Sequence, residues 1–242
     1  MRIEPVTISG STRQSFTVAE TASGRQYRFV LPGPELTADD LAELNKHLEA
    51  HAGQHRVTVL SGSFPPGVSP AAFTALGRAA TDTCQRLLVD TSGEALAALA
   101  ALGCFALKPS VNELAVWAGH HPLPTEVEIA AAAQRLLDAG PNQAVIVSLA
   151  AAGALLLERG APTRRIHAPS VRAVSTVGAG DSLVAGIATA LERGDDLLEA
   201  VRVGVAAGTA TVLRPASELS RPADIARLLP HVQVTDVGTA AP

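Results

Sequence analysis

The sequence has little charge and few aromatic side chains. Of its 242 residues, 17% are charged and 3% aromatic, and the formal net charge is −4. A chain with so little charge and 47% hydrophobic residues is neither disordered nor basic, so nothing in it points to a nucleic-acid partner. The hydrophobic fraction is enough for one substantial core, and a single domain can take up residues 1–242.

Cysteines and long apolar runs are also scarce. Cys84 and Cys104 are the only two cysteines, and both stand beside apolar runs, which favours small buried thiols in a reducing compartment over a disulfide. No stretch of about 18 residues is apolar and free of charge, glycine and proline, which argues against a membrane span. The N-terminus lacks the charged-then-apolar layout of a signal peptide. The sequence therefore predicts a cytoplasmic protein with no membrane partner.

Short apolar strands alternate with helices over most of the chain. Strands are expected at residues 57–60, 87–89, 105–107 and 144–149, a hairpin at 154–157 and 165–167, and long helices at 178–192 and 197–213. This alternation is typical of an α/β protein with a mostly parallel sheet covered on both faces. Residues 14–18 and 26–30 have a period near two and predict two further strands. Residues 235–242 are expected to form a frayed tail.

Polar residues follow directly on four of the predicted strands. They are Ser61-Gly62-Ser63, Asp90, Lys108 and Ser148. Ligands of such sheets bind beyond the carboxyl ends of the strands, so these groups are expected at one edge. For Asp90 the sequence leaves two interpretations open: contact with the pocket, or a cap for the turn at Ser92.

A glycine-rich turn, Gly178-Ala179-Gly180-Asp181, leads into a predicted helix. The backbone N–H groups of a helix N-terminus are unpaired and the helix dipole is positive there, so an anion can bind. Asp181 would lie in the first helical turn, where a carboxylate can accept the proton of a hydroxyl during phosphoryl transfer. The alternative is a tight turn followed by an acid that merely suits the dipole.

Taken together, these motifs resemble the PfkB branch of the ribokinase-like carbohydrate kinases. The segments 61–67, 89–96, 108–114 and 175–182 occur in the order of that family, and the likeness runs from about residue 6 to 229. The chain is most similar to the minor ATP-dependent 6-phosphofructokinases. The resemblance implies a three-layer αβα sandwich with a partial β lid at residues 1–31, which in this family can pair two subunits into a homodimer.

The resemblance also implies an activity, which is phosphoryl transfer from MgATP to a sugar phosphate. Fructose 6-phosphate is the leading acceptor, with tagatose 6-phosphate, fructose 1-phosphate or an unphosphorylated sugar or nucleoside as alternatives. A rival from another class is a catalytically silent nucleotide-binding fragment. The implied cofactors are Mg²⁺ with ATP, and K⁺ as a further candidate.

Individual roles follow from matching positions. The resemblance makes Asp181 the catalytic base and the backbone of Gly178, Ala179 and Gly180 the anion hole. The residues it assigns to nucleotide binding are Lys108, Ser148, Gly153, Val205 and Thr209. Arg13 and Ser63 would bind the phosphate of the sugar, and Glu113 would bind hydrated Mg²⁺. Ser175 and Val177 would bind a monovalent cation. A guanidinium such as that of Arg13 suits a phosphate because it can donate two parallel hydrogen bonds.

The chain departs from the family pattern at several positions. Ser110 stands where the family has asparagine, which predicts a weaker magnesium site. Ala150 replaces a glycine and is expected to crowd the nucleotide, and Arg214-Pro215-Ala216 replaces the loop that completes the monovalent-cation site. The family's first strand and helix, with a Gly-Gly substrate loop, have no counterpart. We therefore expect a domain truncated at its N-terminus, with an exposed sheet edge and an incomplete sugar pocket.

Overall fold

A seven-stranded sheet forms the centre of the computed structural model, which describes residues 3–8, 10–23, 25–63, 65–120, 122–215 and 218–237. Its strands lie side by side in chain order: β3 (Val57–Ser61), β4 (Arg86–Asp90), β5 (Ala106–Leu107), β6 (Ala144–Ser148), β7 (Gly153–Glu158), β8 (Arg164–His167) and β9 (Gln233–Asp236). The strands β3 to β6 are parallel, and each later strand is antiparallel to the one before it. The predicted hairpin is thus confirmed as β7 and β8, and the sheet is mostly parallel.

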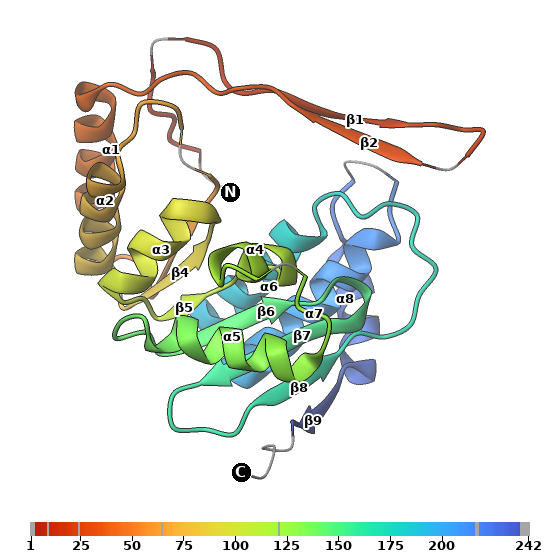
Figure 1. The fold of residues 1–242 in the computed structure, drawn as a ribbon. Helices are drawn as coiled ribbons and strands as arrows, with labels where there is room; N and C mark the ends of the chain where they lie inside the picture. Colours follow the sequence, from red (N-terminus) through yellow and green to blue (C-terminus); the bar gives the residue numbers. More distant parts are fainter. Residues whose placement is uncertain are drawn as a thin grey trace.

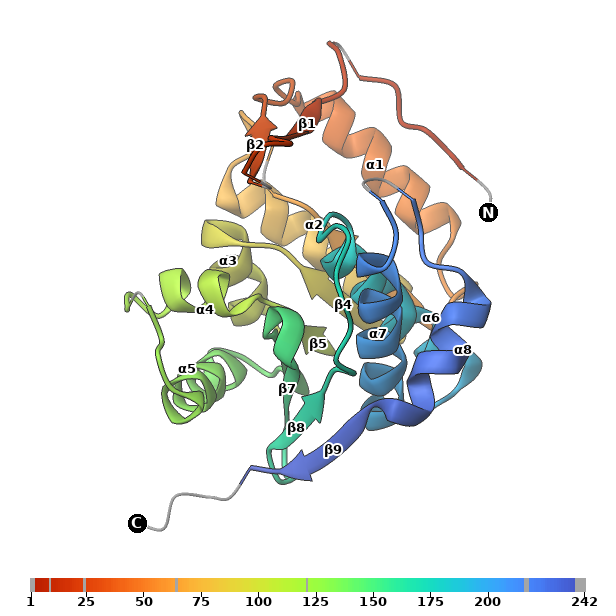
Figure 2. The same cartoon turned by 90° about the vertical axis from the view of Figure 1, so that its right-hand side faces the viewer.

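Helices cover both faces of the sheet, as Figures 1 and 2 show. One face carries α1 (Ala38–Ala50), α2 (Pro70–Thr83), α3 (Gly93–Leu102), α4 (Val111–Trp117) and α5 (Glu126–Asp138). The other carries α6 (Ala179–Arg193), α7 (Leu197–Val212) and α8 (Pro222–Leu228). Two short 3-10 helices, η1 (Ala150–Ala152) and η2 (Leu229–His231), complete the list. The predicted three-layer αβα sandwich is confirmed.

Two apolar clusters fill the space between the three layers. Alternate residues of a strand point to opposite faces, so in β4 Leu87 and Val89 pack towards α2 and α3. Leu88 and Ile146 point the other way, into the cluster formed by α6 and α7. Both clusters need apolar side chains, which is why the central strands are apolar at nearly every position.

The N-terminal strands form a separate two-stranded ribbon that stands off the sheet in both views (Figures 1 and 2). Its strands are β1 (Ser15–Ala19), one residue later than predicted, and β2 (Gln26–Val30). The register sets Phe16 opposite Phe29 and Val18 opposite Tyr27, so these four side chains share one face. The two phenyl rings stack with centroids 5.0 Å apart, yet each of the four side chains is about half exposed.

Two elements differ from the sequence prediction. The prediction treated Ser110 and Glu113 only as a magnesium motif, but they form a capping box that begins α4. The predicted tail at residues 235–242 is partly wrong, because Thr235 and Asp236 belong to β9 and pair with β8. Residues 238–242 of that tail, like Ala216 of the expected cation loop, lie outside the described residues.

Two remaining predictions concern membrane-spanning helices and the cysteines. In the part of the chain that the structure describes, no helix is long and apolar enough to cross a membrane. Both cysteines are free, and Cys104 is buried among α3 and α5, where desolvation raises the pKa of its thiol to about 12. The expectation of a small buried thiol is confirmed for Cys104, whereas Cys84 is only partly buried.

Candidate active site

The polar residues predicted to share one edge of the sheet do so. Ser61, Asp90 and Ser148 are the last residues of β3, β4 and β6, and Lys108 follows β5. Ser61 and Asp90 are register partners, and Ser148 bridges to Ser110 at the start of α4. Because parallel strands end at the same edge, residues far apart in the sequence are brought together there.

Asp90 and Lys108 form a buried ion pair at this edge. The Lys108 ammonium lies 2.8 Å from Asp90 Oδ1, and the two side chains are only 5% and 15% exposed. Burial raises the pKa of Asp90 above its usual value; Lys108 opposes this shift, and the nearby charges of Glu113 and Asp181 add to it. The Asp90 side chain thus pairs with Lys108, and its contact with a ligand pocket stays a prediction.

The glycine-rich turn begins α6 as expected. Gly178 is the N-cap residue, with φ of +76° in the left-handed region, and it has no side chain with which to cap the helix. Asp181 lies in the first turn and is exposed. The N–H groups of this turn can therefore meet an anion beside the Asp181 carboxylate.

The helix α7 packs against this turn. A Cβ at Gly208 of α7 would come within 3.0 Å of the Ala179 carbonyl oxygen, so a glycine lets the helix pack directly against the turn. The preceding segment is fixed by the carbonyl of Val212, which accepts the N–H groups of Val174 and Ser175. α7 thus contacts both the turn and the segment that precedes it.

Three of the residues expected to bind the monovalent cation or the adenine are buried. Ser175 is buried, and its hydroxyl oxygen accepts the N–H of Val177 at 3.3 Å. Val205 and Thr209 lie inside α7 and are 2% and 7% exposed, and the Thr209 hydroxyl donates to the Val205 carbonyl. Neither presents much surface to a ligand, so their assignment to the nucleotide stays a prediction.

The segment between β6 and β7 is strained at one residue. Ala150 has φ of +51° and is the one non-glycine residue with positive φ among those described. The glycine expected at this position would adopt that conformation without steric cost. Gly153 is required both by its φ of +100° and by space, since a Cβ there would lie 2.1 Å from the Ile166 carbonyl oxygen.

Glu113 is the residue expected to hold hydrated Mg²⁺. Its carboxylate accepts the N–H of Ser110 at 2.7 Å, which fixes its orientation at the start of α4. No group of three or more potential metal ligands occurs among the described residues. Protein-bound Mg²⁺ commonly uses one or two carboxylates together with phosphate oxygens and water. Asp90 and Glu113, which act on each other electrostatically, fit that pattern.

Arg13 and Ser63, the residues expected to bind the sugar's phosphate, are in contact. Arg13 Nη1 donates to Ser63 Oγ at 3.0 Å, although the residues are 50 positions apart. They line a cavity of about 380 Å³ that also borders Gly33, Asp40 and Gly62. A neighbouring hollow of about 310 Å³ shares several of its residues and is lined mainly by apolar side chains of α1, β3 and α2.

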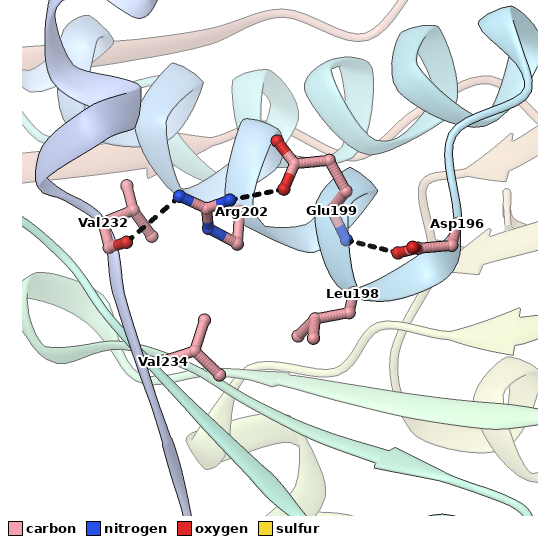
Figure 3. Close-up of a pocket in the computed structure, with 6 residues that line it drawn as sticks. All are labelled: Asp196, Leu198, Glu199, Arg202, Val232 and Val234. Atoms are coloured by element: carbon pink, nitrogen blue, oxygen red, sulfur yellow. Dashed lines mark hydrogen bonds and ion pairs between the residues drawn. The ribbon is translucent and has the colours of Figure 1, made fainter.

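A further hollow of about 360 Å³ lies away from these residues, between the start of α7 and β9 (Figure 3). Its charged groups already have partners: Arg202 donates to the Glu199 carboxylate and the Val232 carbonyl, and Asp196 accepts the Glu199 N–H (Figure 3). These bonds fasten the first turn of α7 to the segment before β9. We assign this hollow a structural role.

Sequence similarity to known proteins shows a phosphotransferase of the carbohydrate-kinase class. Residues 2–224 match the model of the pfkB family carbohydrate kinases, so the chain belongs to that family. It is 42% identical over 238 residues to ATP-dependent 6-phosphofructokinase isozyme 2 of Mycobacterium tuberculosis, covering 96% of this chain and 68% of the relative.

Solved structures agree with this assignment. Phosphofructokinase-2 from Escherichia coli in complex with potassium superposes with a TM-score of 0.83 at 37% identity, over 91% of this chain and 71% of that one. The same enzyme in complex with fructose-6-phosphate gives a TM-score of 0.79 at 36% identity, over 90% of this chain and 70% of that one.

Proposed function

We propose that this chain transfers the γ-phosphoryl group of MgATP to O1 of fructose 6-phosphate, giving fructose 1,6-bisphosphate and ADP. The observation that carries the proposal is the placement of Asp181 in the first turn of α6, beside N–H groups that no side chain caps. The likeness to ATP-dependent 6-phosphofructokinases supports the choice of substrates. The contact between Arg13 and Ser63 supports an acceptor that carries a phosphate.

The reaction requires few protein groups. As the bond from O1 to the γ-phosphorus forms and the bond to the β,γ-bridging oxygen breaks, the O1 proton passes to the Asp181 carboxylate. The N–H groups of the 178–181 turn face the transferred phosphoryl oxygens and stabilise their charge. Mg²⁺ would neutralise the ATP phosphates, with Glu113 and Asp90 as the residues to hold its water shell.

Lys108 also takes part in this proposal. Lys108 is 4% exposed, and its ammonium is already paired with the Asp90 carboxylate. A phosphate that approaches the ammonium therefore meets a cation that already has a carboxylate partner. In the proposal, Asp90 would help to hold the water shell of Mg²⁺, and Lys108 would donate to the nucleotide phosphates. Ser148 and Gly153 lie at the ends of β6 and β7, on the same side of the site.

Assembly, the monovalent cation and the compartment belong to the proposal as well. Residues 1–31 would act as a lid, and the half-exposed apolar face of Phe16, Val18, Tyr27 and Phe29 would pair with a second copy in a homodimer. A K⁺ ion would lie at the backbone of Ser175 and Val177, as the potassium complex of the Escherichia coli enzyme supports. Two free thiols are compatible with the reducing cytoplasm.

Coupled ADP release with a panel of sugar phosphates tests this function. We expect turnover with fructose 6-phosphate, and a 10²- to 10⁴-fold loss of kcat, roughly the range for a general base, in Asp181→Asn. Asp39→Asn is the matched control because Asp39 is an exposed acid in the first turn of another helix, α1. The panel includes tagatose 6-phosphate and fructose 1-phosphate, and runs with and without K⁺; sedimentation velocity on the same samples reports the homodimer.

Two results would contradict the proposal. Turnover that survives Asp181→Asn would remove the role of Asp181 as the base. Binding of ATP without turnover of any sugar would instead favour the silent nucleotide-binding fragment.

A further inference from the structure

Thr91 makes a buried contact across two strand ends that the function described so far does not use. It follows β4 directly and is 4% exposed. Its hydroxyl donates to the carbonyl of Gly62 at 2.6 Å, and the N–H of Gly62 donates to the carbonyl of Asp90 at 3.0 Å. Both backbone groups of Gly62 are therefore held by the last residue of β4 and the residue that follows it.

Gly62 is the residue at which the chain turns from β3 towards Ser63. Its φ of +117° lies in the region that favours glycine, whereas a Cβ there would meet nothing within 4 Å. The glycine is thus needed for its conformation and not for space. Because a glycine peptide rotates easily, the direction of the Gly62 carbonyl must be fixed from outside, and the Thr91 hydroxyl does this.

The orientation of this peptide decides where Ser63 lies. Ser63 follows Gly62 immediately, and its Oγ is the atom that accepts the hydrogen bond from Arg13. A short series of contacts thus runs from Arg13 and Ser63 through Gly62 to Thr91, and on to Asp90 with its partner Lys108. It connects the cavity of Arg13 with the edge of the sheet where Asp181 acts.

We infer that Thr91 is a positioning residue, which sets the geometry of the Arg13–Ser63 pair for the phosphate of the acceptor sugar. This inference rests on the proposed function, because it takes that pair as the site for the sugar's phosphate. Thr91 itself is buried, so we expect it to act through Gly62 and not by contact with the substrate. Its effect should therefore appear in the affinity for the sugar phosphate and not in the handling of ATP.

Thr91→Val tests the inference, because valine keeps the shape of threonine and removes only the hydroxyl. We expect KM for fructose 6-phosphate to rise about tenfold, as for one lost hydrogen bond of about 1.4 kcal/mol, while KM for ATP stays within about twofold. Thr91→Ser retains the hydroxyl and should restore the wild-type KM. Thr81→Val is the matched control, since the Thr81 hydroxyl also donates to a glycine carbonyl, that of Gly77 in α2, outside the site.

A second readout does not depend on activity. In the ligand-free protein, amide hydrogen exchange at Gly62 and Ser63 should quicken in Thr91→Val and remain unchanged in Thr81→Val, with the amides of β4 protected in both. If Thr91→Val does not fold, Thr91→Ala imposes no new branch in the buried site and carries the same measurements.

The outcomes separate this inference from the proposed function. A wild-type chain inactive towards fructose 6-phosphate would contradict the proposed function, and hydrogen exchange would then decide whether Thr91 holds Gly62. An active wild type with an unchanged KM for fructose 6-phosphate in Thr91→Val would overturn the inference alone. Equal rises in both KM values would overturn it too, because they indicate a general loss of structure.

Discussion

The two sides of the candidate site differ in how deeply their helices are buried. α7, which supports the 178–181 turn on the phosphoryl side, buries twelve of its sixteen residues. α1, which lines the cavity on the sugar side and is described in full, buries none of its thirteen. The phosphoryl side thus belongs to the rigid core, while the sugar side is held by a few specific contacts such as those of Arg13, Ser63 and Thr91.

Small residues explain the close packing of the phosphoryl side. A Cβ at Gly204 of α7 would lie 2.6 Å from Ile187 Cγ1 and 2.7 Å from the Leu183 carbonyl oxygen, so the backbones of α6 and α7 meet directly. In α1 the apolar stripe of Leu41, Leu44 and Leu48 borders a hollow of about 310 Å³. α7 is apolar around most of its circumference and is buried, whereas α1 has one apolar stripe among polar residues and is partly exposed.

Truncating one aliphatic side chain in α6 and one in α1 should give the largest difference in stability. Ile187→Ala removes a fully buried side chain and should lower the free energy of unfolding by about 4 kcal/mol. Leu44→Ala removes a half-buried one beside an existing hollow and should cost about 1 kcal/mol, because less contact is lost. Urea denaturation followed by circular dichroism measures both. Equal losses would show that the hollow beside α1 is closed in solution.

The buried ion pair offers the next largest effect. Lys108→Met should destabilise the protein by about 3 kcal/mol, since it leaves the Asp90 carboxylate buried without its partner. The double variant Asp90→Asn with Lys108→Met should recover most of that stability but no kinase activity. Thermal unfolding and the ADP assay separate the two effects. A double variant no more stable than Lys108→Met would show that the pair itself, and not the unpaired charge, determines stability.

The smallest expected effect comes from local backbone strain. The size of this effect should not depend on where in the molecule the residue lies. Ala150→Gly relieves a residue at φ of +51° and should stabilise the protein by about 1 kcal/mol. Gly53→Ala introduces the same strain after α1, at φ of +73° with no neighbour within 4 Å, and should destabilise it by about 1 kcal/mol. Denaturation midpoints of both variants test this pair. Shifts of the same sign would contradict the strain at Ala150.

Local signals in the sequence account for much of the fold. Apolar runs and turn residues predicted the central strands, the long helices and the glycine turn at α6, since each depends on neighbouring residues. The capping box of α4 had a local signal too, Ser110 followed by Glu113, but it was interpreted as a metal motif alone. β9 had a weak signal, because an edge strand of four residues takes its stability from pairing with β8.

The sequence by itself thus determined the alternating α/β architecture, the position of Asp181 in a helix N-terminus and the gathering of polar residues at one sheet edge. Only the tertiary structure decided that Asp90 pairs with Lys108, that Thr91 holds Gly62, and that Val205 and Thr209 are buried within α7. The reason is physical. Hydrophobic periodicity acts within one element, whereas these contacts depend on the register of strands and the packing of helices far apart in the chain.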